Sequence, residues 1–350
     1  METKNKPTNV LIVRFSALGD IAMTIPVVYP LCHANKDVNF VFVTQTWPAG
    51  MFRNRPHNLR VIDIDIHERY SGIKGMWRLA EKLKRHYNID AVADLHSVIR
   101  TWALDTWMKL HGVPVVRMDK QRDARRALVS ASSKGEPLVP TATKYREVFE
   151  KLGLEAPDTF TTLYHDHELP TSEIVPEKKD GEKWIAISPF SSHDGKTYPI
   201  GLMTEVIKTL SKQPNMRIFL LGGGKKEKML LRPFHKKLEN VVSLAETKHN
   251  FTDEYALLGR CDLMLTMDSA NMHLASLMGV PSVVIWGATT PACGFCGHLH
   301  DTKHDVALDY NCRPCGIYGE NDCRYHDFRC LANIAPETVI NHVLEALKDK

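Results

Sequence analysis

The chain has 350 residues, of which 43% are hydrophobic and 25% charged, and its 45 Lys and Arg against 41 Asp and Glu give a net charge of +4. At about 150 residues per domain, this length predicts two domains with sizeable cores. The composition excludes disordered, collagen-like and coiled-coil chains. So small a positive surplus does not indicate a nucleic-acid-binding protein, and we expect any anion to be bound by a local patch.

Neither a targeting segment nor a membrane span is expected. The first apolar run, residues 10–13, is ended by Arg14, so it is too short for the core of a signal peptide. The longest uncharged stretch, residues 269–300, is broken by Gly279, Pro281 and Pro291, which argues against a span. We therefore expect a cytoplasmic protein.

Short β-branched runs alternate with helical patterns along the whole chain. In the first half we expect strands at residues 10–13, 38–43, 59–66, 91–95 and 113–118, and helices near 21–33, 73–87 and 101–110. In the second half we expect strands at 184–188, 217–221, 241–244, 263–267 and 282–286, and helices near 203–210, 227–238, 253–258, 272–277 and 336–348. A charged, helix-poor seam lies at residues 155–183.

This alternation predicts an α/β fold with parallel sheets and helices on both faces. Two facing Rossmann-like domains with a central cleft fit the two halves. In such sheets, ligands bind outside the carboxyl ends of the strands. The strand ends are therefore the places to look for chemistry.

The first strand end carries Gly19 and Asp20 directly before a helix. A carboxylate there is either a helix cap, which is the commoner role of Asp, or a group placed at the mouth of the cleft. The strand ending at Ser188 is followed by Ser191, Ser192 and Lys196. Hydroxyl, N–H and ammonium donors suit a phosphate, although a plain polar loop is equally consistent with this string.

Two further strand ends have the same character. Three glycines, 222–224, allow a close backbone approach, and Glu227 beyond them can accept hydrogen bonds from ribose hydroxyls or remain solvated. At the second of these strand ends, Asp268 and Ser269 come directly before a helix, and the unpaired N–H groups at the start of that helix suit an anion. His273 lies one turn further along and is either a ligand contact or a core histidine.

In combination these strings resemble a known family. They resemble motifs of the bacterial ADP-heptose:lipopolysaccharide heptosyltransferases, glycosyltransferase family 9, and they occur in the order found in that family. The segments concerned are residues 14–20, 191–199, 268–273, 279–281 and 287–291. The resemblance covers essentially the whole chain and implies the GT-B fold. It implies an acceptor-binding domain at residues 1–165, a nucleotide-sugar domain at 166–335, and a last helix, 336–350, that packs back toward the first domain.

The resemblance also implies roles for single residues. Asp20 resembles the family's catalytic base. The donor-binding residues that it implies are Ser191, Ser192 and Lys196 for the diphosphate, Glu227 for the ribose, and Asp268, Ser269, Ala270 and His273 for the sugar and phosphates. Ala270 departs from the family's usual Gly, and a methyl group there narrows the pocket.

Six of the eight cysteines lie between Cys293 and Cys330. Such clustering predicts a local metal clip or a stapled loop. Cys312, Cys315, Cys323 and Cys330 resemble an element of many family members and could hold a structural zinc tetrahedrally, with a reduced or disulfide-stapled loop as the alternative. Cys293 and Cys296 are expected to be structural.

A basic run extends from Arg117 to Lys134. Such a run is usually a solvated helix face, but in a family that glycosylates anionic lipid cores we expect it to form an acceptor cradle. The acceptor-binding residues expected are His96, Arg100, Arg117, Lys120, Arg122, Arg125 and Arg126.

The resemblance implies an inverting glycosyltransferase that moves a heptose or related sugar from ADP-heptose to a lipid-linked, anionic lipopolysaccharide-core acceptor. We expect no catalytic cofactor. We do expect peripheral contact with the inner membrane face. Two alternatives remain open here. An NAD(P)-dependent oxidoreductase would need a dinucleotide fingerprint that the sequence lacks, and a non-catalytic sugar-nucleotide-binding homologue would not need Asp20.

Overall fold

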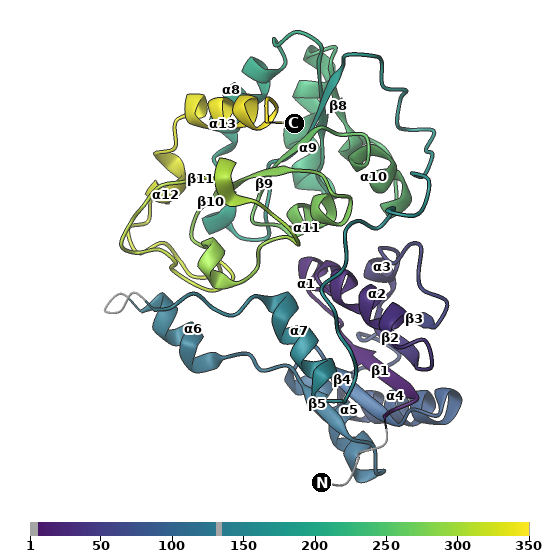
Figure 1. The fold of residues 1–350 in the computed structure, drawn as a ribbon. Coiled ribbons are helices and arrows are strands. Elements are labelled where there is room, and N and C mark those ends of the chain that lie inside the picture. Colours follow the sequence, from purple (N-terminus) through teal and green to yellow (C-terminus); the bar gives the residue numbers. More distant parts are fainter. Residues whose placement is uncertain (1–5, 131–134, 350) are drawn as a thin grey trace. The chain divides into compact units, whose positions relative to one another are not determined.

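The computed structural model describes residues 6–130 and 135–349. The chain divides into two compact units (Figure 1). The first ends at Gln121 and resumes from Val139 to Leu163, and the second comprises Arg122–Leu138 and the chain from Tyr164 onward. The α/β fold predicted from the alternating pattern is confirmed.

The first unit is built on a five-stranded parallel sheet of order β3-β2-β1-β4-β5. Its strands are β1 (Asn9–Val13), β2 (Asn39–Gln45), β3 (Leu59–Ile64), β4 (Ala91–Asp94) and β5 (Val115–Arg117). Its helices are α1 (Leu18–Ala22), α2 (Ile25–Ala34), α3 (Thr46–Ala49), α4 (Gly72–Tyr87), α5 (Ile99–Leu110) and α7 (Thr141–Glu150). The strand order reverses between β1 and β4.

The second unit is built on a six-stranded sheet of order β11-β10-β9-β6-β7-β8. Its strands are β6 (Lys183–Ser188), β7 (Met216–Leu220), β8 (Val241–Ser243), β9 (Leu263–Met267), β10 (Ser282–Trp286) and β11 (Val306–Ala307). Its helices are α6 (Arg122–Val129), α8 (Ile200–Leu210), α9 (Gly224–Lys237), α10 (Phe251–Leu258), α11 (Ala270–Leu277), α12 (Arg329–Ala332) and α13 (Pro336–Ala346). Here the order reverses between β6 and β9.

Both faces of each sheet are covered, which explains why the strands are continuous apolar runs. In β1, Leu11 and Val13 belong to a core cluster with α4 and α5, whereas Val10 and Ile12, on the opposite face, are equally buried. The core of the second unit joins strands β6, β7, β9 and β10 to helices α8 and α13.

One prediction about the elements is wrong. The helix expected at residues 21–33 is two helices, because Thr24 folds its hydroxyl back onto the Ile21 carbonyl and Pro26 cannot continue the hydrogen-bond ladder of α1. The last helix, α13, packs on α8 and on the sheet of its own unit, where Val339, Ile340 and Val343 complete the core.

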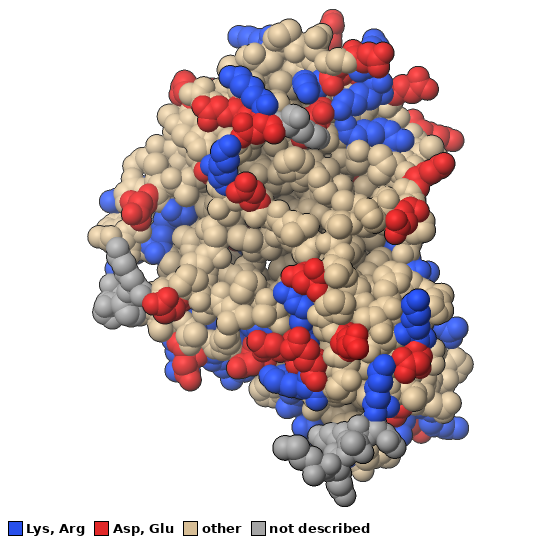
Figure 2. Space-filling view, viewed as in Figure 1, with Lys and Arg blue, Asp and Glu red and all other residues tan. Residues whose placement is uncertain are grey.

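Neither compact unit is continuous in sequence. Residues 122–138, which include α6, belong to the second unit, and the chain then returns to the first unit for α7. On the face in Figure 2, acidic and basic side chains are interspersed, in keeping with the small net charge. None of the helices in the described ranges is long and apolar enough to cross a bilayer.

Candidate active site

The candidate residues gather where each sheet reverses its strand order, the usual ligand position in a doubly wound sheet. In the first unit the helix that follows β1, α1, carries Asp20 in its first turn, and the loop after the neighbouring β4 carries His96. In the second unit the loop after β6 carries Lys196, and Asp268 follows the neighbouring β9.

Asp20 is held in place by an ion pair. Its carboxylate lies 2.5 Å from the guanidinium of Arg14, and both side chains are largely buried. Arg14 in turn donates to the Leu95 carbonyl at 2.6 Å and faces the ring of Tyr145. The carboxylate also accepts the Ala17 N–H at 3.2 Å, so it satisfies the backbone N–H of the N-cap residue of α1. Asp20 therefore helps to begin its helix while Arg14 holds its carboxylate.

His96 lies close to this pair. Its Nε2 is 3.3 Å from the Ser16 hydroxyl, and its ring meets the edge of Phe15. Burial and the nearby charges of Arg14, Lys120 and Arg100 lower the pKa of His96 to about 3. The imidazole is therefore neutral at neutral pH, so in this site it offers hydrogen bonds and no positive charge.

The turn that carries His96 is held by Asp94, the last residue of β4. Its Oδ1 accepts the N–H groups of His96 and Ser97, and its Oδ2 accepts the Thr101 hydroxyl at 2.7 Å. An Asx-type turn of this kind fixes the loop after the strand. Arg100 is exposed on the first turn of α5.

The structure divides the basic run between the two units. Arg117 forms a 2.5 Å ion pair with the buried Asp105, and its guanidinium lies 5.6 Å from the centre of the Trp102 ring, so its charge is already compensated within the first unit. Burial and the neighbouring Asp94 charge raise the pKa of Asp105 well above its usual range, and the Arg117 guanidinium opposes them. Lys120 remains in the first unit with His96 and Arg100.

The other three arginines lie on α6 in the second unit. Arg125 donates to the Tyr318 hydroxyl at 2.7 Å and faces the rings of Phe295 and Tyr318. Arg126 pairs with Asp123 on the same helix, and Arg122 is exposed. Lys134, the end of the predicted run, lies outside the described residues.

In the second unit, Lys196 and Asp268 form an ion pair of 3.3 Å whose side chains are only 11% and 8% exposed. The Thr289 hydroxyl donates to the same carboxylate at 2.6 Å, and the Ser191 hydroxyl donates to the Asp268 carbonyl. A short loop thus brings a hydroxyl and an ammonium together at the end of β9. The Ser192 side chain is exposed.

Helix α11 begins beside this pair. Its N-cap, Ser269, makes no side-chain cap hydrogen bond and instead lies 3.2 Å from the Thr266 hydroxyl. Because no side chain caps the first turn, its N–H groups are available to an anion. Ala270 is the first helical residue and is half-buried, whereas His273 is buried on the next turn.

Glu227 lies on the first turns of α9, beside the glycine loop that follows β7. Its Oε2 accepts the Gly223 N–H at 2.6 Å. A Cβ on Gly222 would lie 3.1 Å from the same oxygen, and Gly224 has a φ of +76°. The glycines therefore allow the loop to fold onto Glu227.

The four clustered cysteines are free thiols. No group of three or more His, Cys, Asp or Glu within the described ranges has an arrangement that could hold a metal ion. The predicted structural zinc is therefore not supported, and no disulfide staples the loop either. Cys293 and Cys296 are a buried and a partly buried thiol, and burial raises the pKa of Cys296 to about 12.

The segment that carries the four cysteines, residues 312–330, instead supports the loop of Lys196. Arg313 donates to the carbonyls of Gly287, Trp286 and Thr289, which ties this segment to the end of β10. Gly319 packs on the stem of Lys196, and a Cβ there would lie 2.6 Å from Lys196 Cγ.

Sequence reasoning missed three of these supporting residues: Arg14, Thr289 and Arg313. Each is a polar residue at or beyond a strand end, and each has at least one partner more than twenty residues away in the sequence. A buried cation directly after an apolar strand, as at Arg14, is the one local signal that could have been used.

The two parallel sheets, each reversing its strand order at its centre, have the GT-B fold, which solved heptosyltransferases share. A family model described as glycosyltransferase family 9 (heptosyltransferase) matches residues 76–325. The chain belongs to this family and is a transferase enzyme.

Relatives cover nearly the full length. The lipooligosaccharide heptosyltransferase 2 of Campylobacter jejuni subsp. jejuni serotype O:2 is 24% identical over 343 residues, 95% of this chain and 96% of the relative. Among solved structures, a glycosyl transferase family 9 protein from Veillonella parvula has a TM-score of 0.73 at 17% identity, covering 98% of both chains. The E. coli heptosyltransferase WaaC with ADP has a TM-score of 0.66 at 21% identity, covering 97% of this chain and 100% of the other.

Proposed function

We propose that the protein transfers a heptose, or a closely related sugar, from ADP-heptose to a lipopolysaccharide-core acceptor with inversion at the anomeric carbon. The observation that carries this proposal is the pair of polar sites at the two strand-order reversals. One holds a carboxylate fixed by Arg14, and the other holds a Lys196–Asp268 pair beside an uncapped helix N-terminus. The relatives' names, and the ADP present in the E. coli WaaC structure, support the donor.

Asp20 is the proposed base. A sugar hydroxyl is a poor nucleophile until its proton has an acceptor, and a positioned base contributes roughly 10²–10⁴-fold to the rate. The Asp20 carboxylate takes the proton while the acceptor oxygen bonds to the anomeric carbon and the bond to the diphosphate breaks. His96, whose pKa is lowered by burial and the nearby cations, is assigned hydrogen bonding rather than proton transfer.

The proposed donor site is in the second unit. The N–H groups of α11, the Ser191 and Ser192 hydroxyls and the Lys196 ammonium bind the diphosphate and stabilise its charge as it leaves. Glu227 accepts hydrogen bonds from the ribose of the nucleotide. Ala270 and His273 face the donor sugar and its phosphates.

The acceptor is proposed to be a lipid-linked, anionic saccharide reached by peripheral contact with the inner membrane face. In the first unit, Arg100 and Lys120 supply positive charge beside the neutral His96. In the second unit, Arg122, Arg125 and Arg126 on α6 supply more. Arg117 is assigned a structural role, because it neutralises Asp105.

Asp20→Asn tests the proposal. The amide keeps the size of the side chain and can still accept the Ala17 N–H, but it cannot take a proton. We expect transfer from ADP-heptose to fall at least about 100-fold, with ADP affinity by calorimetry nearly unchanged. The melting temperature should fall as well, because the buried Arg14 loses its charged partner.

Asp90→Asn is the matched control, since Asp90 also accepts backbone N–H groups but at the opposite end of β1. Wild-type transfer by Asp20→Asn would place the base elsewhere. If Asp20→Asn alone fails to fold, Asp20→Glu restores the charge. Transfer that did not return with that charge would contradict the role of Asp20.

A further inference from the structure

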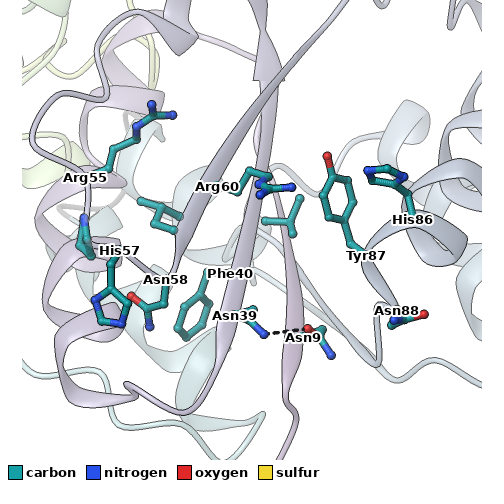
Figure 3. A pocket seen from close by; sticks show the side chains of 13 residues that line it. Asn9, Asn39, Phe40, Arg55, His57, Asn58, Arg60, His86, Tyr87 and Asn88 are labelled. Atoms are coloured by element: carbon teal, nitrogen blue, oxygen red, sulfur yellow. Dashed lines mark hydrogen bonds between the residues drawn. The ribbon is translucent and has the colours of Figure 1, made fainter.

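A second polar hollow lies at the amino ends of the strands of the first sheet (Figure 3). Its volume is about 610 Å³, and its walls come from the starts of β1, β2 and β3, the loop before β3 and the end of α4. Strand β1, five residues long, separates this edge from the Arg14–Asp20 pair, a distance of about 16 Å. The hollow is therefore not part of the proposed active site.

The lining is cationic and rich in amides. The residues that line it with charged or polar side chains are Asn9, Asn39, Arg55, His57, Asn58, Arg60, His86, Tyr87 and Asn88. None of the residues that line it is an acid. Guanidinium, imidazole and amide groups are hydrogen-bond donors that suit phosphate oxygens, and Arg suits them best because its planar fork binds two at once.

The two arginines are placed without a carboxylate partner. Within the described ranges no ion pair forms at Arg55 or Arg60, and Arg60 lies over the ring of Tyr87 at 5.5 Å. Figure 3 shows Arg60 beside Tyr87 and His86, with Arg55 and His57 on the opposite side of the hollow. The aromatic ring thus orients one guanidinium at the wall of the hollow.

The helix dipole accounts for only part of this charge. Lys84, Arg85 and His86 occupy the last turn of α4, where cations are favoured by the helix terminus. Arg55 comes from a loop and Arg60 from β3, so neither serves that terminus. These two exposed arginines therefore add positive charge to this edge independently of the helix terminus.

The cationic lining continues along α4. A neighbouring hollow of about 460 Å³ shares His86 and is lined by Arg78, Lys82, Arg85 and one acid, Glu81. Glu81 lies 3.7 Å from Arg85, and both are exposed, so this pair contributes little. The two hollows together present five Arg and Lys side chains against one carboxylate.

We propose that this edge of the first unit is a second anion site, which binds a phosphate group carried on a polar organic body such as glycerol or a sugar. The larger hollow holds the phosphate between Arg55 and Arg60, and its volume is within the range of ligand pockets, roughly 300–1,000 Å³. The phosphate comes either from a soluble phosphate ester or from the headgroup of an anionic phospholipid.

Two probes distinguish these sources. Glycerol 3-phosphate represents the soluble ester, and vesicles of phosphatidylglycerol and phosphatidylcholine in equal parts represent the headgroup, with pure phosphatidylcholine vesicles as the neutral comparison. Hydrogen–deuterium exchange of the full chain locates binding. We expect slower exchange in residues 55–62 and 84–90 with at least one probe, weakening as salt is added.

The double variant Arg55→Gln/Arg60→Gln should bind that probe at least about tenfold more weakly. The matched control Lys109→Gln/Lys151→Gln removes two exposed cations of the same unit outside the hollow and should bind as the wild type does. Binding of glycerol 3-phosphate assigns the site to a soluble ester, and binding of the anionic vesicles alone assigns it to a lipid.

Three outcomes overturn the proposal: neither probe binds, protection falls only outside these peptides, or the two double variants weaken binding equally. None of them bears on sugar transfer, because the test does not use the proposed donor or the Asp20 region.

Discussion

At the scale of single residues, both candidate sites hold their charges in compensated pairs. Asp20 is paired with Arg14, and Lys196 with Asp268. A buried pair is costly to break, because the remaining charge loses its partner. Substitutions here therefore change stability as well as binding, and each test needs a readout that separates the two.

Lys196 and Glu227 should affect different parts of the nucleotide. Lys196→Ala removes a cation from the proposed diphosphate site, a contact worth about 1.5–3 kcal/mol, so affinity for both ADP and pyrophosphate should fall. Glu227→Gln should weaken ADP binding but leave pyrophosphate binding unchanged, because only ADP carries a ribose. Calorimetric titration of each variant with both ligands measures this difference.

Lys196→Ala also leaves Asp268 unpaired, so the double variant Lys196→Ala/Asp268→Asn is the control for stability. It should recover part of the lost melting temperature without recovering affinity for the diphosphate. Equal loss of pyrophosphate affinity in Glu227→Gln would remove Glu227 from the ribose site.

His96 should make stability depend on acid. Its pKa is about 3 in the folded protein, against 6.5 for an unperturbed histidine, so the unfolded chain binds the extra proton between these values. The contribution of His96 is therefore complete above pH 6.5 and is lost as pH falls toward 3. The free energy of unfolding should fall by up to about 1.4 kcal/mol per pH unit from this group alone.

Urea unfolding at several pH values between neutral and 4.5 measures this slope. His96→Gln should make it shallower, whereas the exposed His167→Gln is the matched control. An unchanged slope in His96→Gln would show that the imidazole is not held neutral by the fold.

At the scale of elements, the segment of residues 312–330 supports the loop that carries Lys196. Arg313 fastens it to the end of β10, the Cys315 N–H donates to the Ala288 carbonyl at 2.9 Å, and Gly319 lies against the stem of Lys196. The Ala288 N–H donates to the Gly195 carbonyl at 2.7 Å, so the loop after β10 also bonds directly to the Lys196 loop. The position of Lys196 thus depends on a segment more than a hundred residues later.

Gly319→Ala tests this dependence. Gly319 has a φ of +74°, and a Cβ there would displace Lys196. Gly181 has a similar φ of +78° but open space around it, so Gly181→Ala carries the backbone strain alone. Both variants should lose about 1–2 kcal/mol of stability, but only Gly319→Ala should weaken ADP binding, by several-fold in calorimetry. Equal ADP affinities in the two variants would show that the segment does not position Lys196.

At the scale of the whole molecule, the two units repeat one architecture. Each sheet is parallel, and each places its polar residues where the strand order reverses, between β1 and β4 and between β6 and β9. The same α/β alternation occurs in NAD(P)-dependent oxidoreductases, so a ligand test separates the classes.

ADP should raise the melting temperature, and NAD⁺ and NADP⁺ should not. A ligand at a hundredfold excess over its Kd stabilises a protein by about 2.7 kcal/mol, which is a readily measured shift. Lys196→Ala is the control, because it should reduce the ADP shift. A larger shift with NAD⁺ than with ADP would contradict the proposed donor site.

The sequence by itself determined the α/β class and the strands, because buried parallel strands are uninterrupted apolar runs that can be recognised locally. It also pointed to strand ends as candidate sites, because ligands of such sheets bind there and because Asp20 and Asp268 follow β1 and β9. The resemblance to family 9 came from the same short strings.

Only the tertiary structure decided which side chains and helices contact one another, because many of these contacts join residues far apart in the chain. Arg125 meets Tyr318, 193 residues later, and this contact helps to place α6 with the second unit. The sequence of helix α13 shows that it has an apolar face but not where that face packs. Its position is set by the complementary apolar surface of α8 and the second sheet. The Arg14–Asp20 pair and the neutral state of His96 likewise depend on burial, which no local pattern of charges specifies.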